Sequence, residues 1–234
     1  MSTSFIELQA SDNTSFQAYV SKPSSNGKHP AILVMQEAFG INNHIRNVCD
    51  RFAAQGYVAI APELFHRTAP KGFTAPYSDF ALAFPHYMAI TTEGLSADFV
   101  ACYKWLQRQE FVVAEKIGTV GFCMGGKCSF LANAILPLSA SVSYYGGKTS
   151  DYASMAAQLH APQLFFWGGQ DHHIPEEEIQ VVIDALKGAD KPYTNVMISD
   201  AHHGFNCDER PSYHPTAAKE SWAMTLAFLE NHLK

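Results

Sequence analysis

The stretch Gly121-Phe122-Cys123-Met124-Gly125 decides the fold of this chain. Before it stands the short apolar run Lys-Ile-Gly-Thr-Val at 116–120, and after it comes Gly-Lys-Cys-Ser-Phe-Leu-Ala at 126–132. The pattern predicts a strand, a tight turn and a helix, because the flanking glycines allow the chain to turn sharply. We expect the side chain between them to stand exposed at the edge of a sheet. The motif is usually written with serine, so the cysteine at its centre calls for a chemical explanation.

Outward from this stretch, strand-like and helix-like segments alternate. Residues 5–8 and 16–21 predict an antiparallel hairpin, and the apolar run at 31–35 predicts a strand buried on both faces. Seven or eight strands interleaved with helices predict a mostly parallel, doubly wound α/β sheet in one domain, residues 1–234. The remaining expected strands are 57–61, 116–120, 140–144, 163–167 and 193–198, and the expected helices are 43–55, 91–109, the segment from Cys123, 175–187 and 216–233, with an irregular excursion at 62–85.

Composition narrows the class of protein. The 234 residues are 47% hydrophobic and 16% charged, which is typical of a globular protein. The formal net charge is −6 and no basic run occurs, so we expect no nucleic-acid partner. No apolar stretch is long enough to span a membrane, and the first residues show no secretory signal. Five cysteines without framework spacing are typical of free thiols, so we expect a cytoplasmic protein. The oligomeric state stays open, and a monomer is compatible with the sequence.

Reactive side chains follow four of the expected strands, at the sheet edge where ligands bind in a doubly wound fold. Glu37 follows 31–35, Cys123 follows 116–120, Asp171 follows 163–167, and the pair His202-His203 follows 193–198. Nucleophile, acid and histidine therefore occur in the chain order of α/β-hydrolase triads. A histidine could take the proton of the thiol, and a carboxylate could orient that histidine.

A thiol attacks a carbonyl well only as the thiolate. An ordinary cysteine has a pKa of about 8.5, so only a minority is ionised at neutral pH. A neighbouring histidine and the positive end of the helix that begins at Cys123 would both favour the thiolate. The backbone N–H of Met124, with that of Ala38 or a neighbour, could stabilise the oxyanion that forms.

Four motifs stand in order along the chain: Gln36-Glu37-x-Phe39-Gly40, Gly121-x-Cys123-x-Gly125-Gly126, Gly168-Gly169-Gln170-Asp171 and His203-Gly204-Phe205. Together they resemble the dienelactone hydrolase (carboxymethylenebutenolidase) family, from about residue 15 to residue 234. The resemblance implies an α/β-hydrolase fold with Cys123 as nucleophile, His203 as base and Asp171 as orienting acid. It also implies that Glu37 helps to ionise the thiol when substrate arrives. The implied chemistry is hydrolysis of an enol lactone through an acyl-enzyme, without metal or organic cofactor.

The arginines that hold the substrate carboxylate in well-known members of that family are not at the matching positions here. The segment 77–84 has no arginine, so Arg67 is the nearby candidate for the first position. Arg210 lies shortly beyond the second position, near residues 206–207. Phe39, Tyr87 and Tyr145 could line a substrate pocket or belong to the core. The sequence therefore predicts the reacting groups more firmly than the substrate.

Several alternatives stay open at this point. Cys123 could be a small buried hydrophobic residue, Asp171 could cap a turn, and Glu37 could be a surface carboxylate. The base could be His202, although the His-Gly-Phe motif selects His203. A zinc site is a further alternative, but adjacent pairs on a loop seldom ligate one ion together, so we expect no metal. The residues of suitable type for zinc are His172, His173, His202, His203, Cys207 and Asp208.

We therefore expect a hydrolase that cleaves a small ester or an enol lactone through a cysteine acyl-enzyme. One alternative is a generalist carboxylesterase with no preference for dienelactone. The other is a ligand-binding protein that keeps the fold with an unreactive thiol. The expected partner in all three cases is a small molecule.

Overall fold

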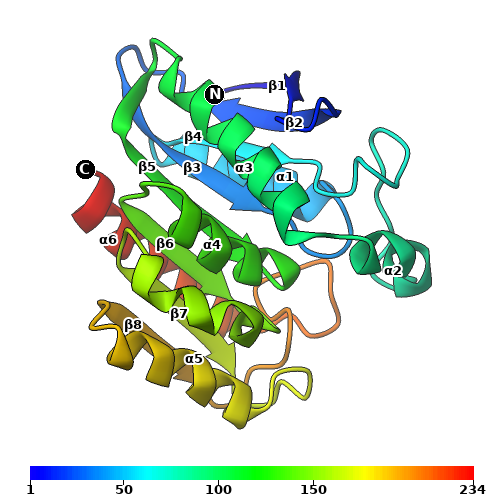
Figure 1. Ribbon diagram of the computed structural model, residues 1–234, viewed down its shortest axis with the longest axis vertical. Coiled ribbons are helices and arrows are strands. Elements are labelled where there is room, and N and C mark those ends of the chain that lie inside the picture. Colours follow the sequence, from blue (N-terminus) through cyan, green and yellow to red (C-terminus); the bar gives the residue numbers. More distant parts are fainter. The chain divides into compact units, whose positions relative to one another are not determined.

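The computed structural model describes all 234 residues and shows eight strands in a mostly parallel sheet flanked by helices (Figure 1). The expected α/β class is confirmed. The chain divides into two compact units, residues 1–117 and residues 118–234. The expectation of one domain over the whole chain stays a prediction. None of the helices has the length and apolar character needed to cross a lipid bilayer.

Unit 1 carries four strands in the spatial order β1 (Ser2–Gln9), β2 (Ser15–Lys22), β4 (Val58–Pro62) and β3 (His29–Met35). β2 pairs antiparallel with both β1 and β4, whereas β3 pairs parallel with β4. Residues 31–35 of β3 and all of β4 are buried. Continuous burial explains why their sequences are apolar runs without alternation.

Helices cover both faces of this part of the sheet. α1 (Asn43–Ala54) and α3 (Thr92–Gln107) lie on opposite faces of the strands in unit 1 (Figure 1). Each begins at a side-chain cap: Asn42 accepts a hydrogen bond from the N–H of Ile45, and Thr91 accepts one from the N–H of Gly94. Such caps satisfy N–H groups that have no partner inside the helix.

The excursion expected to be irregular at 62–85 ends in a helix, α2 (Phe80–Met88). The expectation of an irregular segment was wrong for residues 80–85, which lie in this helix with Pro85 inside it. The helix carries four exposed large apolar side chains, which is unusual for nine residues. They are Phe80, Leu82, Phe84 and Met88, exposed by 42, 53, 48 and 63%.

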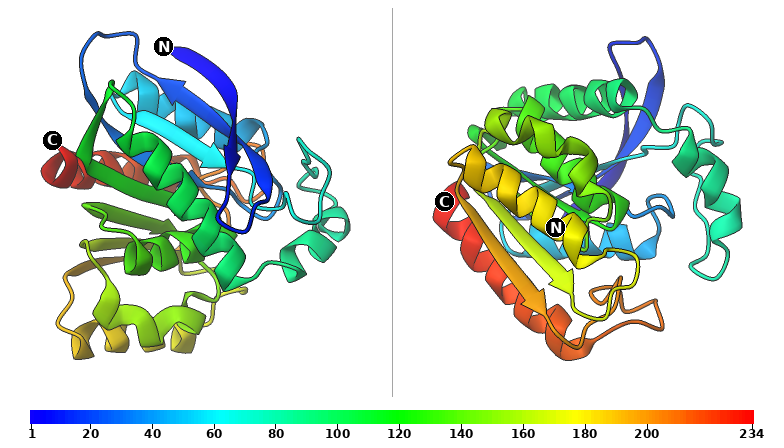
Figure 2. Two further views of the ribbon diagram at one scale, coloured as in Figure 1. Left: turned by 45° about the horizontal axis from the view of Figure 1, so that its top comes forward. Right: turned by 60° about the horizontal axis from the view of Figure 1, so that its bottom comes forward.

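Unit 2 contains parallel strands in the order β5 (Val112–Phe122), β6 (Ala140–Tyr144), β7 (Gln163–Gly168) and β8 (Tyr193–Ile198), with β5 beginning in unit 1. The helices α4 (Met124–Ile135) and α5 (Glu176–Gly188) cover one face together with the 3₁₀ segment η1 (Thr149–Gln158). The closing helix α6 (Pro215–Leu233) covers the other face, as Figure 2 shows.

Three details of unit 2 differ from the expectation. β5 begins at Val112, earlier than the apolar run indicated, and η1 was not expected. Pro175 is the N-cap of α5 instead of a residue in its first turn. These differences concern element ends, where local sequence carries the weakest information.

The strand register places the carboxyl ends of unit 2 side by side. Phe122 pairs with Tyr144, Tyr144 with Phe166, and Gly168 with Ile198. The residues that follow these ends are therefore brought to one edge of the sheet, as parallel topology requires. Cys123 follows β5, Tyr145 follows β6, and Asp171 and His203 follow β7 and β8.

Candidate active site

Cys123 occupies the sharp turn between β5 and α4 in a strained backbone conformation. Its φ is 55° and its ψ is −120°, in a region that residues with a side chain rarely adopt. The surrounding hydrogen bonds hold it there: its N–H donates to the carbonyl of Tyr144 at 3.0 Å, and its carbonyl accepts from the N–H of Gly126 at 2.9 Å. Strain of this kind is typical of a nucleophile presented at a strand–helix turn.

The glycines around the cysteine are required for close packing. A Cβ on Gly121 would collide with the carbonyl oxygen of Gly125, and one on Gly126 would lie 2.7 Å from the Cα of Gly146. Neither glycine has a left-handed φ; the left-handed residue is Cys123 itself. The glycines were correctly predicted to shape the turn. They do so because the absence of a side chain lets Gly121 pack against the backbone of Gly125, and Gly126 against that of Gly146.

His203 and Asp171 form the hydrogen-bonded pair that the triad hypothesis requires. Nδ1–H of His203 donates to Oδ2 of Asp171 at 2.7 Å, and both side chains are largely buried. The second carboxylate oxygen, Oδ1, accepts the backbone N–H of His173 at 2.9 Å. Because both oxygens have donors, the carboxylate is fixed and the imidazole keeps Nε2 available for the nucleophile.

His202 is placed differently from its neighbour. Its Nδ1–H donates to the carbonyl oxygen of Gln170 at 2.9 Å, and the side chain is exposed. The structure therefore brings His203, and not His202, to Asp171. Of the residues of suitable type for zinc, His203 and His202 have separate hydrogen-bond partners, and Cys207 is fully buried.

The charge of Cys123 controls the proton on His203. Burial by itself lowers the pKa of His203, but the negative charge of Cys123, hydrogen bonds to Asp171 and Cys123, and the charge of Asp171 outweigh it and raise the pKa to about 10. The imidazole is therefore protonated at neutral pH when the thiol is ionised. The two side chains then form a thiolate–imidazolium pair.

This pairing gives a titration that can be measured. In the wild-type protein His203 should stay protonated through neutral pH and lose its proton as the pH rises through about 10. In Cys123→Ala the pKa of His203 should fall, because the charge of Cys123 and the hydrogen bond to it, which both raise this pKa, are gone. Imidazole NMR signals over a pH series test this, with Cys128→Ala as the control that removes a buried thiol. An unchanged His203 titration in Cys123→Ala would contradict the pair.

Met124 is the first residue of α4, and N–H groups in a first helical turn have no partner within the helix. It also follows the nucleophile directly, where α/β-hydrolases place one oxyanion donor. The local geometry therefore suits the predicted role. That role stays a prediction.

Glu37, in unit 1, is fully buried at the end of β3. One of its carboxylate oxygens accepts a hydrogen bond from the hydroxyl of Tyr77 at 2.5 Å, and its carbonyl accepts one from the side-chain amide of Gln36. The alternative of a surface carboxylate is wrong. Its catalytic role stays a prediction, as does the oxyanion role of its neighbour Ala38, which is 3% exposed.

Phe39 belongs to an apolar cluster between the end of β3 and α2. Its ring lies 4.7 Å from that of Tyr77 and 5.9 Å from that of Phe80. Ala75 and Ala83 complete the cluster. This apolar cluster joins the end of β3 to α2 within unit 1.

Arg67, in unit 1, is engaged in ion pairs. Its two terminal nitrogens donate to the two oxygens of Asp98 at 2.9 and 2.8 Å, and Nε donates to Asp12 at 2.8 Å. Asp98 is fully buried and also contacts His66 at 3.1 Å. A bidentate pair to a buried carboxylate is costly to break. Substrate binding by Arg67 stays a prediction that this arrangement does not favour.

Arg210, in unit 2, lies against the loop that carries His203. A Cβ on Gly204 would be 2.5 Å from one terminal nitrogen of the guanidinium, so a side chain there would have to displace Arg210. Gly204 also has a left-handed φ of 81°, which glycine adopts without strain. The position suits a residue that packs on the loop, and its proposed substrate contact stays a prediction.

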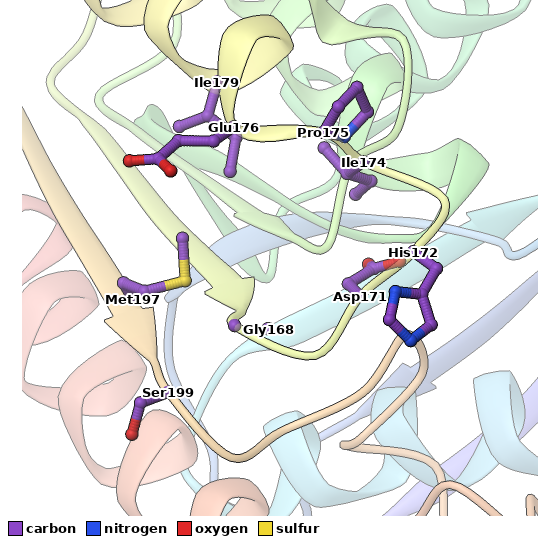
Figure 3. Close-up of a pocket in the computed structure, with 10 residues that line it drawn as sticks. Gly168, Asp171, His172, Ile174, Pro175, Glu176, Ile179, Met197 and Ser199 are labelled. Carbon is purple, nitrogen blue, oxygen red and sulfur yellow. The ribbon is translucent and has the colours of Figure 1, made fainter.

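A cavity of about 520 Å³ opens beside Asp171, between the ends of β7 and β8 and the start of α5 (Figure 3). Asp171 and His172 lie on one side of it, and Glu176 and Met197 on the other. Neither Cys123 nor His203 lines this cavity. A substrate bound in this cavity would not contact the Cys123 thiol, so the cavity is not the place of the reaction.

Tyr145, which the sequence allows in a pocket lining or in the core, is fully buried, and its ring centroid lies 5.1 Å from that of His203. The contact with the candidate base was not predicted, although Tyr145 directly follows the strand at 140–144 and precedes Gly146-Gly147.

Comparison with known proteins agrees with this geometry. Residues 16–233 match the model of the dienelactone hydrolase family. A relative in Escherichia coli K12 named "Putative carboxymethylenebutenolidase" is 34% identical, over 95% of this chain and 84% of its own length. A relative of the same name in Synechocystis is 30% identical, over 95% of this chain and 94% of its own. The crystal structure of a Klebsiella pneumoniae protein described as "Putative Dienelactone Hydrolase" superposes with a TM-score of 0.87 at 30% identity, covering 98% of this chain and 99% of that one.

The sheet, its helices and the turn that carries Cys123 define an α/β-hydrolase. Within that class, the chain belongs to the dienelactone hydrolase family, and it is a hydrolase.

Proposed function

We propose that this protein hydrolyses small, neutral esters or lactones through an acyl-enzyme on Cys123. The observation that carries the proposal is the contact of His203 with both partners at one sheet edge: a 2.7 Å hydrogen bond to Asp171 and a hydrogen bond to Cys123 that raises the pKa of the imidazole. A thiolate paired with an imidazolium is a strong nucleophile beside a ready proton donor.

The proposed reaction has two halves. The Cys123 thiolate attacks the carbonyl carbon, and the N–H of Met124, with that of Ala38, stabilises the oxyanion. As the tetrahedral intermediate collapses, the bond to the leaving oxygen breaks and the His203 imidazolium donates its proton to that oxygen. Neutral His203 then takes a proton from water, the water oxygen attacks the thioester, and the thiolate leaves, so that the original pair is restored.

Glu37 is proposed to add a second buried carboxylate to this chemistry, as the family resemblance implies. Its burial and its hydrogen bond from Tyr77 support a defined position. Buried ionisable groups held in a defined position concentrate at functional sites.

A neutral substrate is favoured by the surroundings of the two candidate arginines. Arg67 is held by Asp98 and Asp12, and Arg210 packs on Gly204. A cytoplasmic location stays a prediction, supported by five unbridged cysteines.

A direct test compares a neutral ester with a carboxylated lactone. We expect hydrolysis of p-nitrophenyl butyrate, a lower kcat/KM for cis-dienelactone, and loss of both activities after alkylation with iodoacetamide. Efficient turnover of dienelactone alone would contradict the neutral substrate but keep the mechanism. No turnover of any ester or lactone, with Cys123 unalkylated, would favour the ligand-binding alternative.

A further inference from the structure

We propose that Tyr145 is a positioning residue that holds the His203 imidazole in line with Cys123. The inference rests on the proposed function for its catalytic meaning, and its structural basis lies entirely within unit 2. Tyr145 directly follows β6, the strand that pairs with the strand before Cys123. It touches no substrate in this account and acts through the imidazole.

The backbone of Tyr145 is strained and firmly held. Its φ is 38°, which is a genuine outlier for a bulky residue. Its N–H donates to the carbonyl of Phe166 at 2.7 Å, and its carbonyl accepts from the N–H of Gly147 at 3.0 Å. The side chain is fully buried. Strain of this kind persists only where the surroundings enforce it, and it concentrates at functional sites.

The ring of Tyr145 packs against the catalytic loop. Its centroid is 5.1 Å from that of His203 at an interplanar angle of 62°, and 5.1 Å from that of Phe205 at 73°. The ring of His173 also lies 5.2 Å from His203, at 74°. The bond to Asp171 fixes one nitrogen of the imidazole, and these edge contacts restrict rotation about that bond.

The residue before Tyr145 holds the nucleophile. The carbonyl of Tyr144 accepts the N–H of Cys123 at 3.0 Å, so one short segment contacts the backbone of the nucleophile and the ring of the base. Cys123 and Tyr145 are also both in the left-handed region. A fixed segment of this kind sets the distance and angle between thiolate and imidazolium, which proton transfer requires.

The test replaces the ring and measures both turnover and the state of the thiol. Tyr145→Phe keeps the ring, and its kcat should stay within about threefold of wild type, whereas Tyr145→Leu should lower kcat roughly 10- to 100-fold with a smaller change in KM, as expected for a misplaced catalytic group. Tyr145→Leu should also slow iodoacetamide alkylation of Cys123 at neutral pH, because a displaced imidazolium stabilises less thiolate.

A matched control separates positioning from stability. Tyr57 is another buried tyrosine, 1% exposed and packed edge-on against Phe52 at 6.2 Å. Tyr57→Leu should lower the Tm without changing kcat or the pH dependence of alkylation. If Tyr145→Leu does not fold, Tyr145→Gly removes the ring while relieving the left-handed backbone, and it should show the same slow alkylation.

Wild-type alkylation and kcat in a folded Tyr145→Leu or Tyr145→Gly protein would overturn the proposal, as would losses that Tyr57→Leu reproduces. The alkylation assay needs no turnover. If wild-type protein hydrolysed no ester, the proposed function would fail, and the alkylation rates would still decide whether Tyr145 positions His203.

Discussion

Cys123→Ala is expected to abolish ester hydrolysis, lowering kcat by about 10³- to 10⁴-fold, while the Tm changes by only a few degrees. The activity falls because alanine offers no group that can form the acyl-enzyme. Stability changes little because the side chain is only partly buried and its backbone is held by hydrogen bonds to Tyr144 and Gly126. Steady-state kinetics and thermal unfolding on the same preparation measure both.

Cys128→Ala is the matched control for this variant. Cys128 is fully buried in α4, so its loss should cost stability through a small cavity and leave kcat near the wild-type value. If Cys123→Ala kept more than about a tenth of the wild-type kcat, which is only 1.4 kcal/mol in barrier height, the assignment of the nucleophile would be wrong.

His203→Ala and His202→Ala should differ by orders of magnitude although the residues are adjacent. His203→Ala removes both the partner of the thiolate and the proton donor, and kcat should fall by about 10³-fold or more. His202→Ala removes only an exposed ring bonded to the Gln170 carbonyl, so kcat should stay within about threefold of wild type, as surface substitutions usually do.

The comparison is made with one ester at saturating concentration, after circular dichroism confirms that both variants fold. A large loss in His202→Ala with little effect in His203→Ala would reverse the assignment. Equal losses in both would mean that the loop as a whole, and not one imidazole, supports the reaction.

Much of the fold could be predicted because local sequence and tertiary environment agree. The apolar run at 31–35 is buried on both faces, and it was identified by its lack of alternation. The turn at Cys123 was identified by its flanking glycines, and in the structure Gly121 and Gly126 leave no space for a side chain. In each case the local sequence pattern and the packing of the folded chain favour the same residues.

The parts of the fold that were not predicted depend on contacts between residues that are far apart in the sequence. α2 contains Pro85 and four exposed apolar residues, so its local pattern indicates no helix with a buried face. The helix that contains Asp98 was predicted from its apolar residues alone. The bidentate bond of Asp98 to Arg67, 31 residues away, was therefore not expected. Such partners are chosen by the fold and leave no local pattern.

The candidate site shows the same division. Chain order and motif spacing selected Cys123, Asp171 and His203, and the structure joins Asp171 to His203 by a hydrogen bond across 32 positions of sequence. The role of Tyr145 depends on a left-handed φ and on a ring contact 58 positions along the chain, and neither is visible in a sequence. Substrate preference depends on how Arg67 and Arg210 are occupied, which also requires coordinates.

The central claim is that Cys123 becomes acylated during turnover. Protein mixed with p-nitrophenyl acetate can be quenched with acid within the first turnovers, digested, and analysed by mass spectrometry. We predict one acetyl group on the peptide that contains Cys123, and none on the peptides that contain Cys128 or Cys207. Turnover with no acetyl group on Cys123, or with the acetyl group on another residue, would contradict the account.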